Sequence, residues 1–236
     1  MSAFEFDRFD ALTFDCYGTL IDWERGILNA LQPVLAPRGV ETGEEELLEL
    51  YAGHEAELEA GPYRPYREVV AASLHRLAAD LGQEVTDDEA ALFADAVGNW
   101  PAFPDTAAAL RHLQERFRLG VITNCDRDLF ARSNLRLGVT LDWIVTAEDA
   151  EAYKPSLAPF ELAFATLDVP RERILHVAQS LFHDHVPAKE LGLTTVWVDR
   201  RHDREGFGAT PEAVAEPDLI VPDMVTLAAL ATDAGF

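Results

Sequence analysis

The sequence predicts an α/β protein with a doubly wound parallel sheet and an inserted all-helical lobe. In the C-terminal half, short apolar runs alternate with amphipathic helical segments, which is typical of a parallel sheet covered by helices on both faces. About 100 residues separate the first apolar run from the next one, whereas a crossover connection needs only a dozen or more. The excess predicts a separate helical lobe inserted after the first strand.

The N-terminal part supplies the first strand and the helical lobe. Residues 11–15 form a short apolar run that ends in a carboxylate, and Gly18 then breaks the extended pattern. Helical periodicity begins at Trp23 and continues to about Gly98. Apolar stripes and a capping box that starts at Thr86 predict helices over residues 44–58, 69–81 and 86–97. We therefore place a core domain at residues 1–21 and 100–236 and a helical lobe at residues 22–99.

The rest of the chain predicts the remaining strands and helices of the core. Short apolar runs indicate buried strands, and a period of 3.6 residues indicates the helices between them. A polar stretch rich in Gly and Pro predicts a surface loop at residues 200–216. The predicted strands cover residues 119–123, 143–145, 174–177, 195–198 and 219–221, and the predicted helices cover residues 105–117, 127–137, 157–167, 186–191 and 224–231.

Composition excludes several classes of protein. The 236 residues are 48% hydrophobic and 26% charged, an ordinary globular mixture that can bury a core. The formal net charge of −23 disfavours binding to nucleic acid or to an anionic membrane surface. Cys16 and Cys125 are too few for a disulfide framework, and the charged N-terminus does not read as a signal peptide. We expect a cytoplasmic protein with no nucleic-acid or membrane partner.

Candidate functional side chains follow the predicted strands, where ligands bind in open parallel sheets. Asp15 ends the first strand, and a buried carboxylate is costly there unless it is hydrogen-bonded or serves as a nucleophile. Lys154 is one of only two lysines, and an ammonium near carboxylates would keep them ionised. Asp184 follows the strand at 174–177, where it either caps a helix or belongs to the site.

Two roles are open for each of the other polar residues at the strand ends. Thr123 and Asn124 precede a helix, where they form a small anion site or Asn124 caps that helix. His183 either assists proton transfer or merely flanks the site. Side-chain alternation directs Cys16 and Cys125 into the core, and a cysteine nucleophile assisted by His183 is the alternative.

Together these elements resemble the haloacid dehalogenase superfamily, whose four motifs occur in the same order. The resemblance implies a Rossmann-like core with an inserted helical cap, and it covers nearly the whole chain. The four motifs fall on Asp15-x-x-Gly18-Thr19, Thr123, Lys154 and Asp184.

Two positions separate this chain from the phosphatases of that superfamily. Phosphatases carry a second Asp two residues after the nucleophile, where this chain has Tyr17. They also carry an earlier carboxylate in the fourth motif, where this chain has Gln179. Loss of a carboxylate weakens a Mg²⁺ site, and a halide departs without the proton that an ester oxygen takes up. The chain therefore resembles the type II 2-haloacid dehalogenases, which implies displacement at carbon with no metal and no cofactor.

This resemblance implies roles for the motif residues and a small anionic carboxylic acid as the substrate. Asp15 would attack the halogen-bearing carbon and invert it, Lys154 would keep Asp15 anionic, and Asp184 would position the water that hydrolyses the aspartyl ester. Trp23 would wall the pocket or else fill the core between the two lobes. The substrate-binding residues would be Cys16, Tyr17, Thr19, Trp23, Thr123, Asn124, Gln179, Ser180 and His183.

Departures from the family pattern leave the substrate open. Phe160 stands where the family has a Tyr, and the position of the family's cap arginine falls near Ala52. Arg64 and Arg67 are candidate replacements for that arginine, or else surface residues. A 2-haloacid is the leading substrate, and opening of azetidine-2-carboxylate by the same Asp chemistry, or a small fluorinated acid, is the alternative. A divergent phosphatase and a catalytically silent metabolite-binding relative are the alternatives from other classes, and a homodimer is left open.

Overall fold

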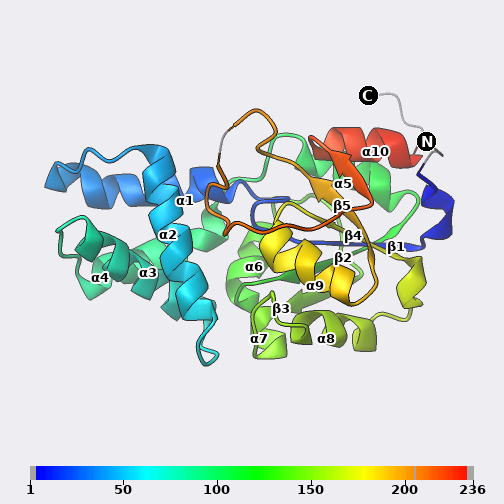
Figure 1. Cartoon of the computed structure of the whole chain (residues 1–236), viewed down its shortest axis with the longest axis horizontal. Coiled ribbons are helices and arrows are strands. Elements are labelled where there is room, and N and C mark those ends of the chain that lie inside the picture. The colour runs from blue at the N-terminus through cyan, green and yellow to red at the C-terminus, as the bar shows by residue number, and fades with distance from the viewer. Residues whose placement is uncertain (1–3, 205, 233–236) are drawn as a thin grey trace.

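A six-stranded parallel sheet forms the centre of the molecule, with helices on both faces (Figure 1). The structure is a computed structural model that describes residues 4–204 and 206–232. It confirms the predicted α/β class. The strands are β1 (Ala11–Phe14), β2 (Arg118–Thr123), β3 (Trp143–Thr146), β4 (Ile174–Ala178), β5 (Thr194–Val198) and β6 (Leu219–Val221).

Strand β1 lies in the middle of the sheet and fixes where a ligand can bind. The strand order is β3-β2-β1-β4-β5-β6, so β1 pairs with β2 on one side and with β4 on the other. The chain order reverses at β1, which makes its carboxyl end the topological switch point of the sheet. Asp15 is the first residue after this strand.

Two helical layers cover the sheet, and alternate residues of β1 contact them. Ala11 packs with the side chains of α8 and α9, whereas Leu12 and Phe14 pack with those of α5, α6 and α10. This alternation is the two-residue period of a strand buried on both faces. The core helices are α5 (Thr106–Gln114), α6 (Arg127–Asn134), α7 (Ala147–Ala150), α8 (Ala158–Thr166), α9 (Val186–Glu190) and α10 (Met224–Thr232).

The segment after β4 differs from the prediction. It opens with a π-helical turn, Leu181–His185, before α9 begins at Val186. Ser180 caps this turn, because its hydroxyl accepts a hydrogen bond from the His183 N–H at 2.9 Å. Asp184 therefore lies inside the turn, and the interpretation of Asp184 as a helix cap is wrong. The short helix α7 was also not predicted.

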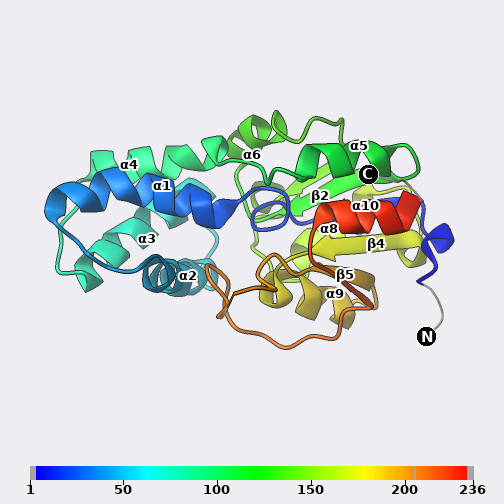
Figure 2. The same cartoon turned by 90° about the horizontal axis from the view of Figure 1, so that it is seen from above.

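Four helices form a lobe beyond the carboxyl ends of the strands, at the left of Figures 1 and 2. None of the helices in residues 4–204 and 206–232 is long and apolar enough to cross a membrane. The boundary of this lobe at residues 22 and 99 stays a prediction. Its helices are α1 (Trp23–Leu35), α2 (Glu44–Glu59), α3 (Tyr66–Asp80) and α4 (Asp87–Asp95).

Hydrogen bonds tie the helical lobe to the core. The buried carboxylate of Asp126, in the loop after β2, accepts the N–H groups of Tyr66 and Arg67 at 2.7 and 3.0 Å. A carboxylate at the N-terminus of α3 complements the helix dipole there. Arg201, in the predicted surface loop, is 7% exposed and pairs with Glu24 of α1 at 2.7 Å. That loop is therefore partly buried against the lobe, which the sequence pattern did not predict.

A close approach in α1 gives a test of this packing. Gly26 lies against Trp100, and a Cβ added there would be 2.2 Å from Trp100 Cγ. We expect Gly26→Ala to lower the free energy of unfolding by about 1–3 kcal/mol, because the clash outweighs the helix propensity of Ala. Gly53→Ala in α2 is the matched control, with open space around the added Cβ and an expected gain of about 0.5–1 kcal/mol. Urea unfolding measures the free energy of unfolding of both variants. An equal gain in stability in both would contradict the close contact between Gly26 and Trp100.

Candidate active site

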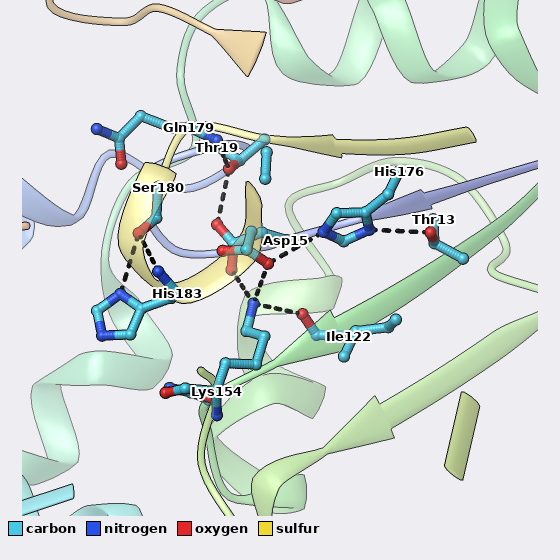
Figure 3. A network of polar contacts seen from close by, with 12 residues as sticks. Thr13, Asp15, Thr19, Ile122, Lys154, His176, Gln179, Ser180 and His183 are labelled. Atoms are coloured by element: carbon cyan, nitrogen blue, oxygen red, sulfur yellow. Dashed lines mark hydrogen bonds and ion pairs between the residues drawn. The ribbon is translucent and has the colours of Figure 1, made fainter. Parts of the chain in front are cut away.

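Asp15 lies at the carboxyl end of β1 and both of its oxygens accept a hydrogen bond (Figure 3). Oδ1 accepts from the Lys154 ammonium at 2.8 Å, and Oδ2 accepts from the Thr19 hydroxyl at 2.7 Å. The turn that returns Thr19 to Asp15 depends on Gly18, whose φ of +93° suits a residue without a Cβ. The Gln179 N–H donates to Thr19 Oγ1 at 2.9 Å and so links this turn to the end of β4.

The Lys154 ammonium joins the two acidic motifs. It is 1% exposed and donates to Asp15 Oδ1, to Asp184 Oδ1 at 2.7 Å and to the Ile122 carbonyl at 2.9 Å. Its three protons therefore have three acceptors, which offsets the cost of burying the charge. Although burial alone would lower it, the two carboxylates hold the pKa of Lys154 well above its ordinary value.

Asp184 has one fully bonded oxygen and one free oxygen. Oδ1 accepts from Lys154 and also lies 3.1 Å from Nε2 of the buried His176. His176 Nδ1 lies 3.0 Å from the Thr13 hydroxyl, which fixes the ring orientation. Asp184 Oδ2 is buried without a hydrogen-bond partner in the described part of the chain. Although burial alone would raise it, Lys154 and His176 hold the pKa of Asp184 well below its ordinary value.

Asp15 and Asp184 therefore differ in their electrostatic surroundings. Burial raises the pKa of Asp15 above its ordinary value, against the opposing effect of Lys154. Repulsion by Asp184 adds to the increase, since Asp184 carries the more firmly held negative charge. The arrangement is a carboxylate with restrained solvation beside a fixed ammonium, which suits a nucleophile.

The side chains around Asp15 do not fit a divalent cation. The Lys154 ammonium already occupies Oδ1 of both Asp15 and Asp184. Across residues 4–204 and 206–232, no group of three or more His, Cys, Asp or Glu side chains is arranged to hold a metal ion. Hard cations such as Mg²⁺ need several oxygen ligands around one point, so we derive no step through a metal.

A cavity of about 30 Å³, which we call the inner cavity, lies between Asp15 and the helical lobe. A second cavity of about 400 Å³, the outer cavity, adjoins it and shares Glu59, Lys154 and His183 with it. The inner cavity has room for water. The inner cavity is lined by Asp15, Tyr17, Trp23, Glu55, Glu59, Tyr66, Asn124, Lys154, Ser180, His183 and Asp184.

Five of the nine predicted substrate-binding residues line the inner cavity, and four do not. The structure thus brings Tyr17, Trp23, Asn124, Ser180 and His183 together around Asp15. Thr19 contacts Asp15, Cys16 and Thr123 are buried, and Gln179 lines a neighbouring cavity with Gly18 and Arg200. Substrate binding by these four residues stays a prediction.

Asn124 does not cap the helix that follows it. Its side chain pairs with the backbone of Lys154 in both directions, through the Lys154 N–H at 2.8 Å and the Lys154 carbonyl at 2.9 Å. It thereby holds the loop that carries the ammonium. The cysteine alternative is disfavoured, because burial raises the thiol pKa of both Cys16 and Cys125 and keeps them protonated.

The cap arginines that we considered do not reach the site. Arg67 pairs with Asp128 at 2.8 Å at the edge of the lobe. Arg64 and Arg67 are both absent from the described lining of the two cavities. The helical lobe instead presents two carboxylates, Glu55 and Glu59.

Glu55 and Glu59 share one face of α2 with Tyr51, because residues four apart lie above one another on a helix. Glu55 Oε1 accepts hydrogen bonds from the Tyr51 and Tyr66 hydroxyls at 2.8 and 2.7 Å. Glu59 Oε2 accepts from Asn124 Nδ2 at 3.2 Å. Burial raises the pKa of Glu55 to about 7 and that of Glu59 well above its ordinary value.

Our sequence analysis missed His176, Glu55 and Glu59. His176 interrupts an otherwise apolar strand, which was a signal for a buried polar contact. Glu55 falls on the apolar stripe that contains Leu48 and Tyr51, and a glutamate on a buried helix face carries the same signal.

The raised pKa of Glu55 predicts a pH-dependent stability. The folded chain binds this proton more tightly than the unfolded chain, so Glu55 lowers stability as pH rises from the ordinary glutamate value to about 7. Glu55→Gln removes the cost and keeps an acceptor for both tyrosines. We expect it to stabilise the protein by up to about 3 kcal/mol at pH 8 and by little at pH 5. Thermal unfolding at both pH values measures this, with exposed Glu57→Gln as the control, and a gain independent of pH would contradict it.

The comparisons with known proteins agree with this geometry. A family model for haloacid dehalogenase-like hydrolases matches residues 9–218. The chain is 24% identical over 225 residues to an (S)-2-haloacid dehalogenase of Pseudomonas putida, covering 92% of this chain and 93% of the relative. It is 26% identical over 223 residues to haloacetate dehalogenase H-2 of a Moraxella species, covering 92% and 95%.

A solved structure shares the whole fold. The L-2-haloacid dehalogenase of Xanthobacter autotrophicus, with chloropropionic acid covalently bound, superposes with a TM-score of 0.80 at 21% identity. The match covers 96% of this chain and all of that one. With the match to the family model, the acidic first motif and the buried lysine of the third, this chain belongs to the haloacid dehalogenase-like hydrolase family.

Proposed function

We propose that this chain is a metal-independent hydrolase that attacks the sp³ carbon of a small 2-substituted carboxylic acid and forms an ester at Asp15. A 2-haloacid is the leading substrate class. The proposal depends above all on one observation, the contact of the Asp15 carboxylate with the buried Lys154 ammonium beside a cavity. A carboxylate held ionised in a poorly solvated site is a competent nucleophile towards carbon.

The first step forms one bond and breaks one bond. An Asp15 oxygen attacks C2 of the substrate, and the halide departs with the bonding electron pair from the opposite face. C2 is inverted, and no proton is needed for the departure of halide. As the ester forms, the negative charge of Asp15 disappears, while Lys154 still has Asp184 as its counter-ion.

The second step hydrolyses the ester, and Asp184 is placed to assist it. Asp184 lines the cavity, and its Oδ2 has no hydrogen-bond partner in the described chain, so it would accept a proton from the water that attacks the carbonyl carbon of the Asp15 ester. The C–O bond between that carbon and the substrate oxygen breaks, and the alkoxide takes up the proton from Asp184, so the 2-hydroxy acid leaves with an oxygen that came from Asp15. The second proton of the water is released when Asp15 returns to its carboxylate. Lys154 stabilises the oxyanion that develops on Asp15.

The remaining residues of the site would bind the leaving group and the substrate carboxylate. Asn124 lies on the leaving-group side of the proposed site, and the N–H groups of Cys16 and Tyr17 would hold the substrate carboxylate. His183 stays neutral, because burial lowers its pKa to about 4. It therefore serves as a hydrogen-bonding wall and not as a permanent charge.

The relatives support carbon–halide chemistry. Both curated relatives are named as dehalogenases of haloacids, and the Xanthobacter enzyme holds chloropropionic acid through a covalent bond. Opening of azetidine-2-carboxylate at C2 is the second candidate, because the cavity wall is acidic and the departing amine stays on the product as an ammonium. A divergent phosphatase has less support, because Tyr17 and Gln179 stand where phosphatases of the superfamily carry carboxylates.

An isotope experiment tests the ester. In a single turnover of 2-chloropropionate in H₂¹⁸O, with enzyme in excess, we expect the lactate to carry unlabelled oxygen and the Asp15 peptide to gain ¹⁸O. Asp15→Asn should lower the rate of chloride release by about 10⁴-fold or more, since no other group in the site supplies the nucleophile.

Direct attack by water would give fully labelled lactate in the first turnover and would contradict the ester. The same preparations are assayed with p-nitrophenyl phosphate in the presence of Mg²⁺ and then of EDTA. Phosphate release that depends on Mg²⁺, without chloride release from any haloacid, would favour the phosphatase instead.

A further inference from the structure

We propose that Glu55 and Glu59 form a binding subsite for a cationic nitrogen, so that the natural substrate is a small 2-substituted acid that also bears an amine. This inference rests on the proposed function and names the substrate class of the same site.

Each of the two glutamates has one oxygen left for a ligand. Both tyrosine hydroxyls reach Glu55 Oε1, and Glu55 Oε2 has no hydrogen bond within the described residues. Glu59 uses Oε2 for Asn124, and its Oε1 likewise has no partner in residues 4–204 and 206–232. Glu55 is 4% exposed and the Glu59 side chain is 6% exposed. Each glutamate therefore keeps one oxygen that can accept a hydrogen bond from a ligand.

The inner cavity is acidic, since four carboxyl groups line it, those of Asp15, Glu55, Glu59 and Asp184. Without a ligand, burial favours the protonated forms of Glu55 and Glu59, and a cation beside them would favour their ionised forms. Among the described lining residues, Lys154 alone carries a permanent positive charge, and it is already shared by Asp15 and Asp184. His183, 3.7 Å from Glu59, is a neutral imidazole at neutral pH.

A second observation also points to a ligand in this cavity. Asp184 lines the same cavity, and its Oδ2 is buried without a hydrogen-bond partner in the described chain. Oxygens that face the cavity without donors therefore lie on the core side as well as on the cap side. The water that hydrolyses the ester would donate a hydrogen bond to Asp184 Oδ2. Glu55 and Glu59 lie on the opposite wall, in α2.

The position of Glu59 places the subsite on the path of the substrate. Glu59 belongs to both the inner cavity and the outer cavity of about 400 Å³. A substrate that reaches Asp15 from the outer cavity must pass it. An ammonium group supplies up to three N–H donors and a full positive charge, which is the partner that two adjacent carboxylates favour. A plain haloacid offers only its own carboxylate and a halogen, and like charges repel.

A pair of isosteric substrates tests the subsite. We measure chloride release from 2-chloro-4-aminobutanoate and from 2-chloropentanoate, with the enzyme-free rate subtracted. We expect kcat/KM to be at least about tenfold higher for the amine. Glu59→Gln should lower the ratio of kcat/KM for the amine to kcat/KM for 2-chloropentanoate about tenfold or more, because the charge pair is lost only with the amine. Glu57→Gln, exposed on the same helix, is the matched control and should change neither.

A binding measurement separates this inference from the proposed function. Calorimetry with the Asp15→Asn variant compares 4-amino-2-hydroxybutanoate with 2-hydroxypentanoate, and we expect the amine to bind more tightly only while Glu55 and Glu59 are intact. Equal affinity for both acids, or the same loss for both in Glu59→Gln, would overturn the subsite even if chloride is released. Selective binding of the amine without chloride release from either substrate would retain the subsite and overturn the proposed reaction.

Discussion

The site depends on one buried ammonium that lies between two buried carboxylates. Lys154 contacts Asp15 and Asp184 at 2.8 and 2.7 Å, and all three side chains are withdrawn from solvent. Each charge would be costly to bury alone, and the Coulombic gain between opposite charges is largest where the dielectric constant is low. The removal of Lys154 would leave two neighbouring carboxylates without a counter-ion, so the three side chains form one unit. In that unit Lys154 opposes the increase in the pKa of Asp15 that burial causes, and it holds Asp184 beside Asp15.

The fold supplies the contacts that this unit needs. Asp15 ends the central strand, the Ile122 carbonyl on β2 takes the third proton of Lys154, and His176 on β4 holds Asp184 from behind. Asn124 anchors the backbone of Lys154, so the ammonium reaches its position from a fixed loop. Strands β2, β1 and β4 are neighbours, and their carboxyl ends meet at the switch point of the sheet. The helical lobe lies beyond this edge of the sheet (Figures 1 and 2), and α2 presents Glu55 and Glu59 to the cavity there.

Much of this arrangement was predictable from the sequence because it depends on local patterns. The alternation of strands and helices gave the α/β class, and the four motifs placed Asp15, Lys154 and Asp184 at strand ends. The facing of the cap residues was not predictable, since a helix built from Glu, Leu and Ala shows its buried side only after it packs. Glu55 therefore looked like one acidic surface residue among many. The π-helical turn was also missed, because it depends on the Ser180 cap and not on periodicity.

The ionisation of Asp15 is the property that tests this account most directly. Carbon-13 NMR of chains labelled at the Asp carboxyl carbon follows it, with the signal assigned by its loss in Asp15→Asn. We expect the pKa of Asp15 to be higher in Lys154→Met than in the native protein, because the ammonium opposes the increase that burial causes. Lys189→Met, which removes the other lysine from its exposed pair with Asp218, should leave the signal unchanged. The same Asp15 titration in the native protein and in Lys154→Met would contradict the account.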